Sequence, residues 1–325
     1  MLKIGVLGAG HLGKIHLKCL GELKKHFDLA GFYDIDRTVS DAVAGQSGVP
    51  AFESYEALLG AVDVVDIVTP TTAHYGLASQ AIRRGKHVFI EKPVTQTPEE
   101  AVALIELSKK HGVVAQVGHV ERFNPAMLAV QHLPMNPMFV EAHRLAMFNP
   151  RGTDVPVVLD LMIHDIDIVL SLVKSEVKTI SASGVPVVSD TPDIANARVE
   201  FENGCVANFT ASRISMKQMR KVRLFQKDAY ISLDFLKKES QILRMYDEEN
   251  KPADGNFMAL ETPTGQKFIT MEMPEVGEVN AIKMELRVLA ECIGNGGAVA
   301  VSLEEGYRAL KMAHDVMREI GARRF

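Results

Sequence analysis

The chain has 325 residues, of which 47% are hydrophobic and 24% are charged. This length suits two domains rather than one core, and the composition excludes a wholly disordered chain. The formal net charge of −5 excludes a general electrostatic attraction to nucleic acid or to anionic lipid. No apolar run reaches the roughly 18 residues of a membrane span. Three scattered cysteines and a start without a signal-peptide pattern predict a reducing, cytoplasmic location.

Short apolar runs alternate with amphipathic stretches through the first third of the chain. The apolar runs predict strands at residues 3–7, 29–33, 64–68, 87–90 and 113–117. The amphipathic stretches predict helices at residues 11–23, 73–84 and 98–110. Strands alternating with helices predict βαβ units with right-handed crossovers. We therefore expect an α/β fold in which residues 1–121 form a dinucleotide-binding Rossmann domain with a doubly wound parallel sheet.

The pattern changes after about residue 120. We expect a long apolar helix over residues 157–172 and two closing helices, the second of which starts with a Ser302–Glu305 capping box. Strands are predicted at residues 138–147, 195–202, 205–211, 221–226, 230–234, 240–244 and 268–273, and a loop at 248–266. Asn203-Gly204 predicts a type I′ turn. Residues 122–325 should therefore form an α+β domain with a mainly antiparallel open sheet, which serves substrate binding and oligomerisation.

A glycine motif follows the first predicted strand and opens the first predicted helix. It reads Gly8-Ala9-Gly10-His11-Leu12-Gly13, which matches GxGxxG in the structural context that the dinucleotide-binding pattern requires. One glycine permits a tight turn, one allows the backbone to approach a pyrophosphate, and one allows close packing of helix on strand. The helix N-terminus then offers free N–H groups to phosphate. We expect this loop to bind the cofactor through Gly8, Gly10, His11, Leu12 and Gly13.

The second predicted strand ends at Asp34, 21 residues after Gly13. A carboxylate at this position accepts hydrogen bonds from the adenosine ribose and repels a 2′-phosphate, which favours NAD over NADP. Arg37 complicates the choice, because an arginine can bind that phosphate. The simpler alternative is that Asp34 only caps a turn. We predict that Asp34 and Arg37 contact the cofactor, that the cofactor is NAD, and that NADP is the alternative.

The fourth predicted strand leads directly into Glu91-Lys92-Pro93. Ligands of an open parallel sheet bind beyond the carboxyl ends of its strands, which places Glu91 and Lys92 at the cofactor cleft. Pro93 stiffens the turn, and we predict a cis peptide bond between Lys92 and Pro93.

Three ionisable residues interrupt the apolar helix of the second domain. Spacings of four and three put Asp160, His164 and Asp167 on one helix face. A surface patch with a satisfied histidine is the simplest explanation. A divalent cation is another, but no second histidine or cysteine completes a recognisable ligand set, so we predict no metal.

Together with Lys92, this helix suits the oxidation of a secondary alcohol. The reaction needs a base for the hydroxyl proton, and a histidine that titrates near neutrality suits that task. Lys92 can hydrogen-bond the same oxygen and stabilise its developing negative charge. Asp160 can orient the other two groups electrostatically.

These residues resemble the glucose–fructose oxidoreductase, inositol dehydrogenase and rhizopine-catabolism family of sugar dehydrogenases. The resemblance covers the glycine motif, Glu91-Lys92-Pro93, the spacing of Asp160 and His164, and the closing helices. It implies that Lys92, Asp160 and His164 form a catalytic triad. The segment Thr69-Pro70-Thr71…His74 resembles the family's loop beside the cofactor, which implies that Thr69, Pro70 and His74 contact it. Asparagine often stands in the family where this chain has Thr71.

Two short segments narrow the resemblance. Residues 118–125 and 162–167 look like those of members that oxidise the 3-hydroxyl of UDP-N-acetylglucosamine-type sugars. Arg122 and Asn124 would then join Asp160 and His164 in binding substrate, since the planar guanidinium of an arginine matches the oxygens of a diphosphate. A salt bridge at the domain interface is an equally good explanation of Arg122.

The sequence thus predicts an NAD(P)-dependent dehydrogenase of a sugar or sugar nucleotide, with a small-molecule substrate. Dehydrogenation of inositol, a free aldose, a dihydrodiol or a tetrapyrrole is an alternative within the same class. A non-catalytic NAD(P)-binding sensor or regulator is an alternative from another class, which the intact lysine, aspartate and histidine disfavour. The resemblance also implies a homo-oligomer, a dimer or tetramer, with the open sheet as its interface.

Overall fold

The computed structural model describes residues 1–149, 155–263, 265–275 and 277–322. Residues Met1–Phe123 and Asn280–Lys311 pack into one compact unit, and Asn124–Val279 with Met312–Phe325 form a second. The N-terminal segment of the first unit ends at Phe123, whereas the sequence predicted the domain boundary at residue 121. Residues 280–311, which were predicted to belong to the second domain, pack in the first unit.

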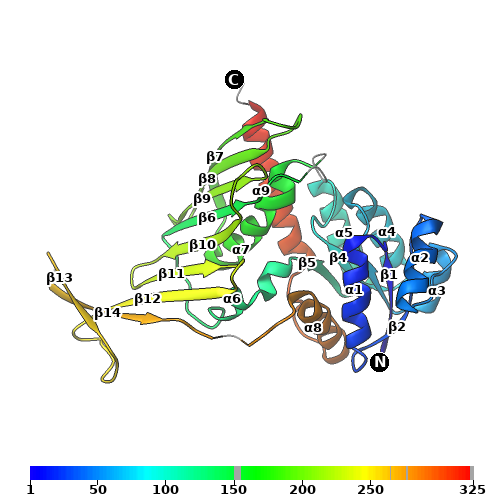
Figure 1. Cartoon of the computed structure of the whole chain (residues 1–325), viewed down its shortest axis with the longest axis horizontal. Helices are drawn as coiled ribbons and strands as arrows, with labels where there is room; N and C mark the ends of the chain where they lie inside the picture. Colours follow the sequence, from blue (N-terminus) through cyan, green and yellow to red (C-terminus); the bar gives the residue numbers. More distant parts are fainter. Residues whose placement is uncertain (150–154, 264, 276, 323–325) are drawn as a thin grey trace. The chain divides into compact units, whose positions relative to one another are not determined.

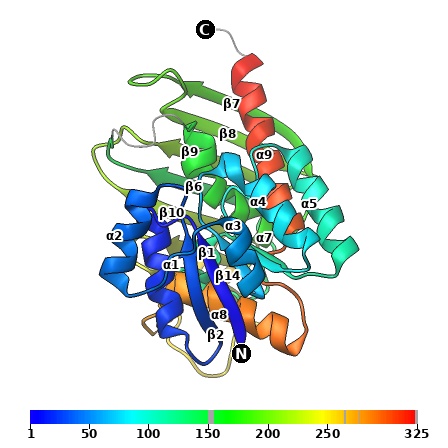
Figure 2. The same cartoon turned by 90° about the vertical axis from the view of Figure 1, so that its right-hand side faces the viewer.

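The first unit is built on a five-stranded parallel sheet in the order β2-β1-β3-β4-β5. Figure 2 shows β1 and β2 running side by side. The strands are β1 (Leu2–Leu7), β2 (Phe27–Tyr33), β3 (Val64–Ile67), β4 (His87–Glu91) and β5 (Ala115–Gly118). The helices are α1 (His11–Glu22), α2 (Arg37–Ser47), α3 (Tyr55–Ala61), α4 (Thr71–Arg83), α5 (Pro98–His111) and α8 (Ala281–Asn295), with a 3₁₀ turn at Val120–Phe123. The chain reverses its winding direction between β1 and β3, and ligands of such sheets bind at this point.

Helices α2 and α3 were not predicted. Each is short and buries few side chains, so neither carries a long apolar stripe. Both begin with a side-chain cap, because Asp36 accepts a hydrogen bond from the Thr38 N–H and Ser54 accepts one from the Ala57 N–H.

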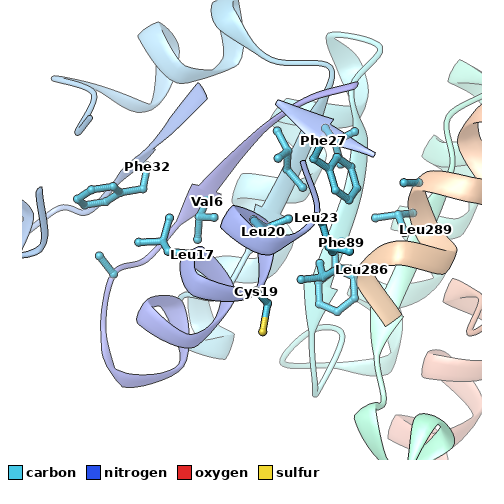
Figure 3. Packing of buried hydrophobic residues seen from close by; sticks show 14 of the residues in the cluster. Val6, Leu17, Cys19, Leu20, Leu23, Phe27, Phe32, Phe89, Leu286 and Leu289 are labelled. Atoms are coloured by element: carbon cyan, nitrogen blue, oxygen red, sulfur yellow. The ribbon is translucent and has the colours of Figure 1, made fainter. Parts of the chain in front are cut away.

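The position of α8 follows from its apolar face. Leu286 and Leu289 are fully buried and pack in one cluster with Phe89 of β4 and Leu20 of α1 (Figure 3). A stripe of this kind stabilises the fold only where another apolar surface covers it. Helix α1 and strand β4 provide part of that surface, which is why this C-terminal helix belongs to the first unit.

The second unit contains a nine-stranded sheet in the order β13-β14-β12-β11-β10-β6-β9-β8-β7 (Figure 1). All neighbours are antiparallel except β6 and β9, as the mainly antiparallel prediction requires. The strands are β6 (Phe139–Leu145), β7 (Val177–Val185), β8 (Ile194–Phe201), β9 (Val206–Ser212), β10 (Met219–Phe225), β11 (Ala229–Asp234), β12 (Glu239–Asp247), β13 (Met258–Thr262) and β14 (Gly265–Glu272). The helices are α6 (Pro125–Leu128) and α7 (Ile163–Val173). Helix α9 (Leu303–Ala322) contributes to both units.

Two local predictions in this unit were wrong. Residues 258–262 form β13, although the polar stretch around them predicted a loop, because they pair with β14 at the edge of the sheet. The β8–β9 turn is not of type I′, since Gly204 has a positive φ of 86° but Asn203 does not. The Gly204 N–H donates to Phe201 O instead, and the Asn203 side chain accepts from Cys205 N–H. A left-handed glycine after a tight turn is the pattern of a three-residue hairpin loop.

The predicted helix over residues 157–172 begins with a π-helical turn, Val158–Met162, and continues as α7. Inserted π-turns are rare and occur frequently at functional sites. A buried ion pair ties α7 to β6, since the Nη2 and Nε atoms of Arg144 lie 2.8 and 3.1 Å from Asp165 Oδ1. Removing one partner of such a pair typically costs about 3–5 kcal/mol, so this contact fixes the helix strongly.

Two helices begin with a capping box, and the sequence predicted the one at the start of α9. Ser302 Oγ accepts from the Glu305 N–H while Glu305 Oε2 accepts from the Ser302 N–H, which confirms the predicted capping box. Thr97 and Glu100 form a second box at the start of α5. Among the helices of the described residues, none is both long and apolar enough to cross a membrane.

Candidate active site

The glycine motif forms a tight loop between β1 and α1. Gly8 has a φ of 92°, and a Cβ there would lie 2.8 Å from Val68 O. A Cβ on Gly13 would lie 2.0 Å from Gly8 O, so helix and loop touch at this point. A Cβ on Gly10 would meet nothing within 4 Å, and no side chain caps the helix there. The three glycines therefore perform the turn, the open approach and the close packing that a bound pyrophosphate requires.

Asp34 lies where β2 ends and touches the glycine loop. Its Oδ2 accepts a hydrogen bond from the Ala9 N–H at 2.7 Å, and its Oδ1 accepts one from the Asp36 N–H at 2.9 Å. The carboxylate is half-buried and fixed beside the loop, which is the position that ribose recognition needs. Arg37 is exposed at the first position of α2.

The buried side chain of His74 contacts the loop after β3. This side chain is 1% exposed, with Nδ1 2.9 Å from Pro93 O and Nε2 2.9 Å from Thr69 O. Burial lowers the pKa of His74, while the two carbonyl oxygens act in the opposite direction. The ring joins the loop of Thr69 and Pro70 to the turn after β4. This position favours a supporting role for His74 over the predicted direct contact with the cofactor.

Lys92 follows the last residue of β4, at the carboxyl edge of the sheet, and its peptide bond with Pro93 is cis as predicted. Lys92 is half-buried. The carboxylate of Glu91 points into the protein, where Oε2 accepts the Lys92 N–H at 3.1 Å and Oε1 lies 3.2 Å from His16 Nε2. Glu91 therefore positions the turn, and its predicted contact with the cofactor stays a prediction.

Sequence reasoning missed the groups beneath this turn. His16 of α1 and Asp66 of β3 are fully buried, with His16 Nδ1 2.9 Å from Asp66 Oδ2. Glu285 of α8 is also fully buried. One of its carboxylate oxygens lies within 4.8 Å of a ring nitrogen of His16 and of a carboxylate oxygen of Glu91. Two features of the sequence could have indicated this cluster. Asp66 lies in the middle of an otherwise apolar strand, and His16 lies on the buried face of α1.

The second unit supplies the other two predicted catalytic residues. Asp160 lies in the π-helical turn and His164 in the first turn of α7, and both are half-buried. Asp167 is 1% exposed and is therefore less accessible than Asp160 and His164, and the predicted common face of the three residues stays a prediction. The π-helical turn changes the winding ahead of α7, which a regular 3.6-residue period does not anticipate.

The two predicted substrate residues, which begin the predicted second domain, make contacts within the protein. Arg122 Nη1 donates to Glu305 Oε1 at 3.1 Å, a salt bridge within the first unit. Asn124 is buried, with Oδ1 accepting the Ala126 N–H and Nδ2 donating to Phe235 O. These contacts favour structural roles, and substrate binding by either residue stays a prediction.

The first unit therefore presents a cradle that fits a dinucleotide. The open space at Gly10, the uncapped start of α1 and the fixed Asp34 carboxylate all lie at the carboxyl ends of β1 and β2. Lys92 lies at the same edge, after β4. This edge of the sheet therefore offers groups that suit a ribose and a pyrophosphate, and the contacts themselves stay predictions.

Family models match both parts of the chain. Residues 2–119 match the oxidoreductase family with an NAD-binding Rossmann fold, and residues 141–231 match the C-terminal domain of the glucose–fructose oxidoreductase, inositol dehydrogenase and MocA family.

Individual relatives agree with these matches. The chain is 41% identical over 236 residues to the UDP-N-acetylglucosamine 3-dehydrogenase of Acidithiobacillus ferrooxidans, covering 72% of this chain and 74% of that protein. It is 30% identical to the scyllo-inositol 2-dehydrogenase (NAD(+)) of Bacillus subtilis, over 66% of this chain and 68% of the relative.

Solved structures extend the likeness over the whole chain. A structure of the Acidithiobacillus ferrooxidans UDP-N-acetylglucosamine 3-dehydrogenase superposes with a TM-score of 0.88 at 34% identity, covering 99% of this chain and 98% of that one. A levoglucosan dehydrogenase in complex with NADH and levoglucosan has a TM-score of 0.83 at 18% identity, which shows a shared fold. With its glycine cradle, its lysine after β4 and its two matched domains, the chain belongs to the NAD-binding glucose–fructose oxidoreductase, inositol dehydrogenase and MocA family of oxidoreductases.

Proposed function

We propose that this protein is an NAD-dependent dehydrogenase that oxidises the 3-hydroxyl of a UDP-N-acetylglucosamine-type sugar. The observation that carries the proposal is the similarity to the Acidithiobacillus ferrooxidans UDP-N-acetylglucosamine 3-dehydrogenase, at 41% identity and across both domains in the superposed structures. The segments around Arg122 and His164, which resemble such enzymes, support the same substrate class.

In the proposed reaction, NAD supplies the hydride acceptor. His164 takes the proton of the sugar hydroxyl, since an imidazole is a good base near neutral pH. Lys92 donates a hydrogen bond to the same oxygen and stabilises its developing negative charge. Asp160 orients these two side chains electrostatically. Lys92 belongs to the first unit, and Asp160 and His164 belong to the second.

Asp34 supports NAD over NADP. Its carboxylate is fixed by the Ala9 and Asp36 N–H groups, so it cannot easily turn away from a 2′-phosphate. A carboxylate fixed at this position repels a 2′-phosphate and can accept hydrogen bonds from the ribose hydroxyls of NAD.

The direct test is a coenzyme-reduction assay. Purified protein is mixed with NAD or NADP and with UDP-sugars, inositols and aldoses, and the near-ultraviolet absorbance of reduced nicotinamide is followed. We expect the largest kcat/KM with UDP-N-acetylglucosamine and NAD. No reduction with any compound, while titration shows that NAD binds, would contradict the proposal and favour a non-catalytic sensor.

An inositol is the second candidate substrate. The 30% identity to the scyllo-inositol 2-dehydrogenase of Bacillus subtilis supports it, at a lower similarity and a smaller coverage of the chain. Reduction of NAD by an inositol but not by UDP-sugars would decide in its favour.

We also propose that the protein works in the cytoplasm as a homo-oligomer. Cys19, Cys205 and Cys292 are all free thiols, as expected in a reducing compartment. Exposed apolar side chains occur on β12, β13 and β14, namely Met245, Met258, Leu260 and Met271. Exposed apolar surface at one end of a sheet supports an interaction site there. Size-exclusion chromatography with light scattering should give a dimer or tetramer, and a monomer at micromolar concentration would contradict this.

A further inference from the structure

Four ionisable side chains meet in the interior of the first unit, directly beneath the Glu91–Lys92 turn. His16, Asp66 and Glu285 are fully buried and Glu91 is 8% exposed. They come from α1, β3, β4 and α8, so the cluster joins four elements of the fold. The Cys19 thiol, one turn further along α1, also lies close enough for the charge of His16 to affect its pKa, which burial raises.

The cluster cannot hold all its possible negative charges. Three ionised carboxylates beside one imidazolium would leave a net charge of −2 in a buried site, which is very costly. Burial raises the pKa of Glu285 well above its ordinary value, and the nearby Glu91 carboxylate raises it further. Both carboxyl oxygens of Glu285 are buried without a hydrogen-bond partner. A protonated, neutral Glu285 therefore relieves the charge excess.

His16, unlike Glu285, carries a charge, because its ring is protonated. Burial lowers its pKa, but the carboxylates of Asp66 and Glu91 more than offset this and raise the pKa to about 11. Geometry agrees, because Nδ1 lies 2.9 Å from Asp66 Oδ2 and Nε2 lies 3.2 Å from Glu91 Oε1. A neutral imidazole has one N–H, which the hydrogen bond to Asp66 uses. An imidazolium also pairs by charge with Glu91 at 3.2 Å, although Nε2 is not aligned for a hydrogen bond there.

We infer that His16 is a positioning residue, a buried imidazolium that holds the Glu91 carboxylate, and through it the backbone of Lys92, while Glu285 stays uncharged. The contact passes from His16 to Glu91 Oε1, and from Glu91 Oε2 to the Lys92 N–H at 3.1 Å. The inference rests on the proposed function, in which Lys92 contacts the reacting hydroxyl. A displacement of about 1 Å at a reacting group can cost about 100-fold in rate, so a support of this kind affects catalysis.

The first measurement needs no turnover. In isotopically labelled protein without ligands, nitrogen NMR of the His16 ring reports its protonation, and a His16→Gln variant or correlation to the backbone assigns the signal. We expect both ring nitrogens to carry protons from pH 6 to pH 9. A neutral ring at pH 7 would overturn the inference, and so would one equivalent of a divalent metal bound to the purified protein.

Two matched variants then separate positioning from folding. Glu91→Gln retains an oxygen for the Lys92 N–H but removes the negative charge beside His16. We expect kcat for UDP-N-acetylglucosamine to fall about 10- to 100-fold, with little change in the Kd of NAD. Glu285→Gln replaces a neutral acid by a neutral amide of the same shape, and kcat should stay close to that of wild type. Equal losses in both variants, or none in Glu91→Gln, would contradict the inference.

The Lys92 amide resonance gives a further readout that does not need substrate. It should keep its chemical shift in Glu285→Gln and move in Glu91→Ala, which removes the acceptor. Failure of the proposed function looks different from failure of the inference. Full activity of Lys92→Ala would reject the catalytic role of Lys92 and the inference with it. An inactive Lys92→Ala beside a fully active Glu91→Gln would reject the inference alone.

Discussion

Replacing Lys92 by alanine should lower kcat by about 100- to 10,000-fold, the range that a positioned acid–base or oxyanion-stabilising group contributes. His164→Ala should cause a loss of the same order, because the hydroxyl proton then has no nearby base. Since the two side chains act on the same oxygen, the double variant should be little worse than either single one. The measurement is steady-state reduction of NAD by UDP-N-acetylglucosamine.

The controls for this prediction test binding and surface effects separately. The Kd of NAD should be nearly unchanged in Lys92→Ala, because the glycine loop and Asp34 bind the cofactor on their own. Lys110→Ala and His132→Ala, which alter exposed residues away from the predicted site, should leave kcat unchanged. If Lys92→Ala and His164→Ala both turned over at the wild-type rate, the proposed catalytic residues would be wrong.

Replacing Gly13 by alanine should lower the free energy of unfolding by about 3 kcal/mol, since an added methyl group in a tightly packed place forces the backbone apart. The added Cβ would lie 2.0 Å from Gly8 O, and a backbone atom cannot move aside as a flexible side chain can. Chemical denaturation of the protein without cofactor measures the change. Gly21→Ala, on the same helix with nothing within 4 Å, should be neutral or slightly stabilising.

Gly10→Ala tests the cofactor loop apart from the fold. The new methyl group meets nothing within 4 Å, so stability without cofactor should match wild type. It occupies the space in which a pyrophosphate approaches the backbone, so the Kd of NAD should rise at least about tenfold, or about 1.4 kcal/mol. An unchanged Kd would mean that the pyrophosphate does not lie at this glycine.

Local features of the sequence were sufficient to predict much of the first unit. The five strands of the parallel sheet are mostly apolar, because a sheet covered on both faces needs apolar side chains on both sides. The glycine motif predicted a loop whose three glycines each have the expected surroundings. The Ser302–Glu305 capping box was also predictable, since a cap depends on residues three positions apart. Such features involve neighbours in sequence, which is why one sequence reveals them.

Other features depended on which elements meet. Helix α8 follows the second domain in sequence but packs in the first unit, because its apolar face fits against Leu20 and Phe89. Strand β13 exists because β14 pairs with it at the sheet edge, although its own side chains are exposed. The π-helical turn at Asp160 also escaped prediction, since a regular helical period does not show an inserted residue.

By itself, therefore, the sequence determined the Rossmann architecture, the cofactor loop and the position of Lys92 after β4, since each follows from local pattern and the end of a strand. Only the tertiary structure decided the charge state of the buried cluster. His16, Asp66, Glu91 and Glu285 lie as much as 269 positions apart (285 − 16), and no local pattern relates them. Their protonation depends on distance and burial, because the energy of a charge in the interior is set by the neighbours that replace water.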